Sequence, residues 1–296
     1  MSYTLSTILV DLYGELGQLT VSTATSAGTT ATIVDNKQAN KIGDEDSVSW
    51  AAFIIEDAGG EGAAPEGEMA LVTSYADSTG TFTSPASSYT VAPSTGDVYG
   101  FTNDFYPYFD MIQVVNRALK SLGEVPLTDT TTLDTAASQT EYACAVDWKR
   151  SRPLRIDVQT KTTDANDNQW QKLWNWDYIP AAAGSTSLII LPQLPAGKGL
   201  RIWYLGVHGT LSAYNDDVNE HLPDQLVLAA CVEKALVWQN SRMQGGDDFL
   251  LQRLNDARQE LAIAKATYAP WRPRRDPNLL ILSRGVDSNN LSVPEV

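Results

Sequence analysis

A cysteine, a histidine and several acids lie close together in the stretch NEHLPDQLVLAACVEKALVWQNSR, residues 219–242. Such a set would suit covalent catalysis if the cysteine had a base within hydrogen-bonding distance and donors for an oxyanion. On a helix that starts near Pro223, Cys231 shares a face with Asp224, but His221 precedes the helix. The apolar neighbours of Cys231 are typical of a small core residue. We therefore expect no catalytic residue here.

Two other stretches superficially match ligand-binding loops. A calcium loop starting at Asp164 would need glycine at its sixth place and glutamate at its twelfth, where Gln169 and Asn175 stand. The glycine-rich residues 59–68 have a proline in place of the third glycine of a phosphate loop, and their three glutamates repel phosphate. Two histidines and two cysteines are too few for a typical metal site, and no GxSxG, Walker or CxxC motif occurs. We expect no metal, no cofactor and no enzyme.

The segment NQWQKLWNWDY is rich in aromatic residues. If it forms one strand, four of them share a face by alternation: Trp170, Trp174, Trp176 and Tyr178. An exposed face of this kind would stack on a sugar, whereas a buried one would belong to a sandwich core or a protein interface. The sequence leaves both open.

The charge of the chain is unevenly distributed. The net charge is −15, but residues 1–101 alone hold 13 acidic and 2 basic residues, a net charge of −11. Such a chain is not expected to bind nucleic acid or anionic membranes generally, because phosphate affinity needs a basic surface. No secretory signal or membrane-spanning run is evident, and two cysteines indicate buried thiols in a reducing compartment. We expect a protein that folds in the cytosol.

Apolar periodicity predicts four helices. The first runs from Leu5 to Leu16 and ends at Gly17, and the second begins after a cap at Asn103 or Asp104, with Pro107 in its first turn. The third begins at Pro223, and its interior is apolar nearly all round, broken only by Glu233 and Lys234. The fourth follows the turn GGDD, so the last two form an antiparallel hairpin.

The intervening segments are β-rich, which predicts an α+β fold. Residues 18–102 form an acidic β-rich insertion, and residues 124–216 form a second antiparallel module, each a small sandwich or barrel. The helical segments 1–17, 103–123 and 217–268 then form a discontinuous four-helix core. Residues 269–296 are too rich in proline for a helix and predict an extended C-terminal arm.

A symmetric assembly would account for two of these features together. A helix that is apolar on all sides must be covered on all sides, and the strand-like NLLILS in the arm needs a partner. Neighbouring copies would supply both. Six side chains of the hairpin are expected at the interface between copies: Leu226, Ala230, Leu236, Trp238, Leu254 and Leu261.

The order of these elements resembles the head-to-tail adaptor, or connector, proteins of tailed bacteriophages. The resemblance lies in the short first helix, in YFDMIQVVNRALKSLG leading into a β module, and most closely in the hairpin that starts with LPDQ and turns at GGDD. The segment from TATIVD to PSTGDVYGF is similar to β insertions in several phage structural proteins. The insertion at residues 18–102 is large and departs from the pattern of the shorter adaptors. The resemblance therefore assigns no role to it.

The resemblance implies a non-enzymatic virion protein that assembles in the host cytoplasm as a closed ring of about twelve copies beneath the portal. The ring would join the portal to the tail or nozzle, with double-stranded DNA passing through without specific binding. The arm would reach the portal or a neighbouring subunit through eight residues: Trp271, Arg272, Arg274, Arg275, Leu279, Leu280, Ile281 and Leu282. The alternative is a carbohydrate- or receptor-binding phage tail protein, which an exposed tryptophan face would favour.

Overall fold

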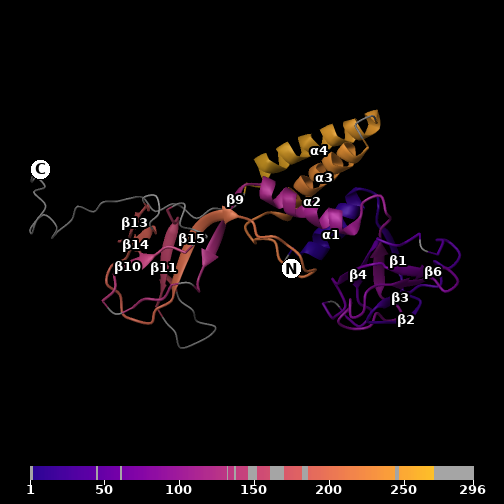
Figure 1. Ribbon diagram of the computed structural model, residues 1–296, viewed down its shortest axis with the longest axis horizontal. Helices are drawn as coiled ribbons and strands as arrows, with labels where there is room; N and C mark the ends of the chain where they lie inside the picture. The colour runs from indigo at the N-terminus through magenta and orange to yellow at the C-terminus, as the bar shows by residue number, and fades with distance from the viewer. Residues whose placement is uncertain are drawn as a thin grey trace, which may run out of the picture. The chain divides into compact units, whose positions relative to one another are not determined.

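The computed structural model describes residues 3–44, 46–60, 62–131, 133–136, 138–145, 152–160, 170–181, 186–243 and 247–269. Within these ranges the protein is a mixed α+β structure with four helices and four antiparallel sheets, none closed into a barrel (Figure 1). The chain divides into two compact units. The described residues up to Val125 and from Val207 to Ala269 lie in the first unit, and those of Pro126–Gly206 lie in the second.

The first unit contains all four helices: α1 (Leu5–Glu15), α2 (Tyr108–Ser121), α3 (Asp224–Arg242) and α4 (Asp248–Thr267). The helices confirm the prediction from periodicity, but the predicted cap of α2 is wrong. Pro107 is its N-cap, and no side chain caps it. The residue before a proline disfavours helical backbone, so α2 cannot begin earlier. Asn103 instead accepts a hydrogen bond from the Phe105 amide, at 3.1 Å.

Helix α3 packs against α1, α2 and α4 of its own chain (Figure 1). Its inward side chains are fully buried there, among them Val227, Ala230 and Cys231. The apolar residues of α4 that face α3 are buried too, including Leu254 and Ala257. The expectation that neighbouring copies must cover α3 is therefore corrected: much of this cover comes from the protein's other helices.

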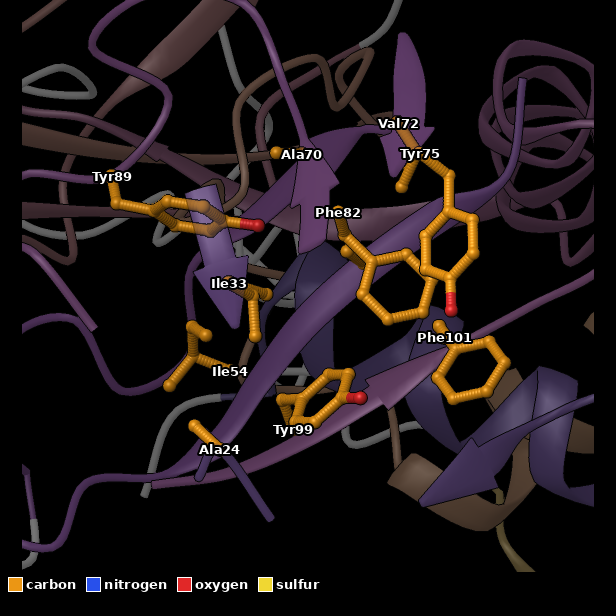
Figure 2. Close-up of a cluster of buried hydrophobic side chains, with 11 residues drawn as sticks. Ala24, Ile33, Ile54, Ala70, Val72, Tyr75, Phe82, Tyr89, Tyr99 and Phe101 are labelled. Atoms are coloured by element: carbon orange, nitrogen blue, oxygen red, sulfur yellow. The ribbon is translucent and has the colours of Figure 1, made fainter. Parts of the chain in front are cut away.

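The β-rich part of the first unit consists of two sheets. One has the strand order β1 (Thr20–Thr23), β8 (Val98–Phe101), β4 (Ala51–Glu56), β5 (Met69–Leu71), and the other β2 (Ser26–Thr29), β3 (Thr32–Val34), β7 (Thr81–Thr83), β6 (Ser74–Ala76). Side chains from both sheets meet in one buried cluster (Figure 2). The ring of Phe82 lies 5.8 Å from that of Tyr99 and 5.0 Å from that of Phe101. Of the two expected architectures, the module therefore has the sandwich and not the barrel.

A buried tyrosine joins this sandwich to the helices. Tyr13 of α1 is fully buried, and its ring lies 5.8 Å from Phe53 of β4. Its hydroxyl donates to the Tyr106 carbonyl at 3.0 Å, so the polar tip is satisfied inside the apolar joint. Burial raises the pKa of this hydroxyl well above its usual range. The helices and the acidic sandwich are thus parts of one unit.

The second unit also contains two sheets across a shared core. Their strand orders are β12 (Trp170–Lys172), β11 (Arg155–Gln159), β15 (Leu200–Val207), β9 (Glu124–Asp129), and β10 (Glu141–Ala143), β14 (Leu188–Ile190), β13 (Asp177–Ile179). Ile156, Ile189 and Ile202 are fully buried between them. Neither sheet closes into a barrel, so this module too is sandwich-like in the residues that the structure describes.

The segment between β15 and α3, residues 208–223, forms hydrogen bonds with α1 and α2. Asn116 of α2 is buried and forms two hydrogen bonds with the backbone of Leu211. It donates to the Leu211 carbonyl and accepts from the Leu211 amide, both at 2.8 Å. The amide groups of Leu5 and Ser6, at the start of α1, donate to the carbonyls of Asp216 and Tyr214. Helix N-termini leave such donors without partners inside the helix, so this segment completes α1.

Replacing Asn116 by alanine should lower the free energy of unfolding of the first unit by about 2 kcal/mol, because two buried backbone groups of Leu211 lose their partner. Thermal and urea unfolding of the purified chain would measure this. Arg117→Ala, one residue along on the exposed side of α2, is the matched control and should change stability by less than about 0.5 kcal/mol. Equal effects of the two changes would contradict a stabilising role of the hydrogen bonds between Asn116 and Leu211.

Candidate functional site

The cysteine and histidine of residues 219–242 do not lie together as a nucleophile with its base. Cys231 is fully buried, and burial raises the pKa of its thiol to about 12. Burial likewise raises the pKa of Cys144 to about 11. His221 lies 3.6 Å from the carboxylate of its neighbour Glu220. A thiol needs a lowered pKa and an adjacent base to attack a substrate, and these thiols have the opposite environment.

The second histidine has a structural role. His208 is buried, its Nδ1 lies 2.8 Å from the Gly209 carbonyl, and its Nε2 accepts from the Asn219 amide at 3.0 Å. This pattern places the ring proton on Nδ1 and leaves neither nitrogen directed at a ligand. In the described ranges no three His, Cys, Asp or Glu residues lie together as metal ligands would.

The two loop motifs contribute no site either. The residues Asp164–Gln169 lie outside the described ranges. In the glycine-rich loop, Glu66 accepts a hydrogen bond from the Gly62 amide, and the buried Glu68 accepts one from the Thr90 amide at 2.7 Å. Glu66 thus binds the backbone of its own loop, and Glu68 ties the end of the loop to Thr90. None of the described helices has both the length and the apolar character needed to cross a bilayer.

The residues expected at the interface between copies are mostly internal. Leu226, Ala230, Leu236 and Leu254 are at most 4% exposed within one chain, so they pack the helices together and offer no surface to a partner. Trp238 is only partly exposed, and its ring packs against Tyr106 at 6.0 Å between centroids. Leu261 is partly exposed as well. The eight residues of the expected arm, Trp271 to Leu282, lie outside the described residues.

The expected aromatic face is not a single face. Strand β12 pairs with β11, whereas β13 pairs with β14 in the other sheet, so the chain changes sheets between Lys172 and Asp177. Alternation is lost at that crossing. Trp176 is 8% exposed and belongs to the core, while Trp174 is 67% exposed. The prediction that Trp170 to Tyr178 present one aromatic surface is therefore wrong.

A different cluster forms on the outward side of β12, β11 and β15, and we name it the Trp–Arg face. Register places Asp157 opposite both Lys172 and Arg201, and Arg155 opposite Trp203. Because these positions share a parity opposite to that of the buried Ile156, they project from the outer side of the sheet. The Trp–Arg face has seven members: Arg155, Asp157, Trp170, Lys172, Trp174, Arg201 and Trp203.

A buried carboxylate organises this face. Asp157 is fully buried beneath its neighbours and accepts from Arg155 Nε at 2.5 Å, from Arg201 Nη2 at 2.8 Å and from Trp203 Nε1 at 3.0 Å. Two guanidinium groups therefore pair with one buried carboxylate. The two arginines are held in fixed positions at the surface, with side chains 33% and 26% exposed.

The tryptophan rings of the face each lie against a cation. Arg201 lies 4.8 Å from the ring centre of Trp170 and 5.4 Å from that of Trp203, and Lys172 lies 4.0 Å from that of Trp174. Such cation–π contacts fix the rings and the charges together. Among the described residues that define it, the face carries three cations and one carboxylate, a net charge of +2 on a chain whose net charge is −15. It is suited to binding an anionic partner.

Sequence reasoning missed three central members of this face, Asp157, Arg201 and Trp203. A signal existed in RIDVQ and LRIWYL, where polar and apolar residues alternate, so that Arg155, Asp157, Arg201 and Trp203 fall opposite to the isoleucines. What alternation alone did not provide was the pairing of β11 with β15, which brings these side chains together.

The sequence matches no model of a known protein family. It has no significant similarity to any curated protein.

The buried thiols should be inert in the folded protein. A thiol-specific disulfide reagent reacts with the thiolate, and the raised pKa of both cysteines keeps the folded-state thiols protonated at pH 8. We expect two slow reactions limited by opening of the fold, and rapid reaction of both thiols in denaturant. Rapid labelling of Cys231 in the native protein would contradict its place in the helical core.

Asp157→Asn should destabilise the second unit by about 3 kcal/mol, because two arginines then share a site without a compensating charge. Loss of the Asp157 carboxylate should also shift tryptophan fluorescence, since Trp203 donates a hydrogen bond to it. Urea unfolding followed by fluorescence measures both effects. Asp177→Asn, at an exposed position of β13, is the matched control and should change neither by much. A D157N variant as stable as the control would show that the ion pairs of Asp157 do not stabilise the second unit.

Proposed function

We propose that the protein is a non-enzymatic structural protein of a phage virion, a head-to-tail adaptor at the neck. About twelve copies would form a closed ring that joins the portal to the tail or nozzle. The support from sequence is the order of elements. The strongest part is the helical hairpin that starts at LPDQ, turns at GGDD and ends with the fourth helix. The support from structure is a helical part that carries apolar side chains outward.

The observation that carries the proposal is the outer side of α4. Phe249 and Ile263 are 68% and 65% exposed, and they lie fourteen residues apart, close to four helical turns, so both occupy the side away from the buried Leu250 and Leu254. An outer helix face is normally polar, because exposed apolar area is unfavourable in water. Phe109 of α2 is also 62% exposed. A neighbouring subunit in a ring would cover these side chains.

In this proposal the four helices form the ring wall as a discontinuous core, and the two sandwiches are insertions in it. In place of the buried Leu226, Ala230, Leu236 and Leu254, the proposal assigns the interface to the exposed Phe249 and Ile263 of α4 and Phe109 of α2. A ring requires two different patches on each subunit, which meet around one axis.

The acidic composition fits a channel through which DNA passes. Proteins that hold DNA neutralise its phosphates with lysine and arginine, and residues 1–101 hold 2 basic residues against 13 acidic ones. Acidic walls would let double-stranded DNA slide without stable or specific binding. Assembly would take place in the host cytoplasm, with the portal and the tail or nozzle proteins as partners.

A carbohydrate- or receptor-binding tail protein is the second candidate. One observation favours it: Trp174 is 67% exposed at the surface of the second unit. Exposed tryptophans stack on the apolar faces of sugar rings.

The proposal is tested by measuring the particle mass of the purified protein, alone and with the portal of the same virus. We expect a closed ring of about twelve copies when the portal is present. Phe249→Asp should prevent the ring, because it places a charge in the apolar contact. Asn255→Asp, on another exposed side of α4, changes the charge equally and should leave the ring intact.

A stable trimer that ignores the portal would overturn the adaptor proposal. Binding to glycans that depends on Trp174 would then support the carbohydrate-binding alternative.

A further inference from the structure

We infer that the Trp–Arg face of one copy binds Asp44, Asp46 and Val48, in the segment before β4, of a second copy. The inference names a contact within the proposed ring and rests on that proposal. Each chain carries both patches on different units, so the contact is heterologous and can repeat around a closed ring.

The Trp–Arg face has the composition of a protein-binding hot spot. Tryptophan and arginine are the residues most enriched where binding energy concentrates. Here Asp157 holds Arg155 and Arg201 in place before any partner arrives, through bonds of 2.5 Å and 2.8 Å. Binding therefore loses little side-chain entropy at these residues, which favours affinity.

The positions of the cations favour a carboxylate partner over a sugar. Lys172 lies over the ring of Trp174, and Arg201 lies over the ring of Trp170, so a cation already occupies one face of each ring. A sugar needs such a ring face for stacking. A carboxylate instead approaches the cations directly, and its charge-assisted hydrogen bonds are stronger than neutral ones.

The same chain supplies a matching surface in the loop before β4. Asp44 and Asp46 are exposed, and Val48, two residues further, is 37% exposed. Both aspartates are held by hydrogen bonds: Asp44 accepts one from the Asp77 amide at 2.7 Å, and the Asp46 amide donates one to the Gly43 carbonyl at 3.1 Å. Two carboxylates beside an apolar side chain complement two kinds of group on the Trp–Arg face, its cations and the exposed Trp174.

The opposite end of β4 provides the comparison. Glu56 is exposed and Glu66 is half-buried there, so this end is acidic too. None of the large apolar side chains exposed in the described residues lies between Glu56 and Glu66, whereas Val48 accompanies Asp44 and Asp46. Asp44, Asp46 and Val48 therefore fit the Trp–Arg face better, and Glu56 with Glu66 serves as a matched control.

The test is a charge-exchange cycle on the full-length protein, with self-association measured by sedimentation across a concentration series. Lys172→Glu should weaken association about tenfold at low salt, and the pair Asp44→Lys and Asp46→Lys should do the same. Combining all three changes in one chain should restore association to within about threefold of the unchanged protein. Trp174→Ala should also weaken it, and this loss should depend little on salt.

The control pair Glu56→Lys and Glu66→Lys changes the charge as much as the pair Asp44→Lys and Asp46→Lys does. It should leave association unchanged. Equal weakening by this control, or no weakening by Lys172→Glu, would overturn the inference. Circular dichroism of each variant checks that the fold is retained, and all changed residues lie at least partly exposed.

Imaging the same variants on the portal separates the two proposals. Intact rings from Lys172→Glu would refute this contact and leave the adaptor function standing. A charge rescue in an assembly that ignores the portal would refute the adaptor function and retain the contact. Unchanged association together with glycan binding that Trp174→Ala abolishes would assign the face to a sugar.

Discussion

The architecture depends on the burial of one helix. The middle of helix α3, from Leu226 to Trp238, is apolar except at Glu233 and Lys234, so it is stable only where other segments remove its surface from water. The segments that do so, α1, α2 and α4, are widely separated in the sequence. The chain between them must leave the helices and return, and in both intervals it does so as a two-sheet sandwich. The hydrogen bonds of Leu211, Tyr214 and Asp216 close this arrangement by tying the returning chain to α1 and α2.

Two buried aspartates show how the same group has different consequences in the two sandwiches. Asp35 is fully buried and accepts from Ser22, Tyr99 and the Lys37 amide, so its charge is compensated locally by neutral donors. Asp157 is also fully buried, but two arginines and a tryptophan compensate it from the outer side of the sheet. The first arrangement fixes a core. The second fixes a cationic surface, because each guanidinium has more donors than one carboxylate can satisfy.

This contrast gives the protein two surfaces of opposite character. The first sandwich lies in a stretch of net charge −11, and the second presents a face of net charge +2. Electrostatic complementarity guides encounter and orientation more than it adds affinity, whereas exposed apolar side chains such as Trp174, Phe249 and Ile263 would contribute burial in the proposed assembly.

The sequence by itself determined the local features of this protein. Apolar spacing located all four helices, and the apolar neighbours of Cys231 identified it as a core residue, because both signals arise within a few helical turns. The tertiary structure alone decided what depends on distant segments. The cover of α3 comes from its own chain, and the aromatic run from Trp170 to Tyr178 divides between two sheets. Asp157 meets Arg201 across 44 residues of chain, through strand pairing that no local pattern specifies.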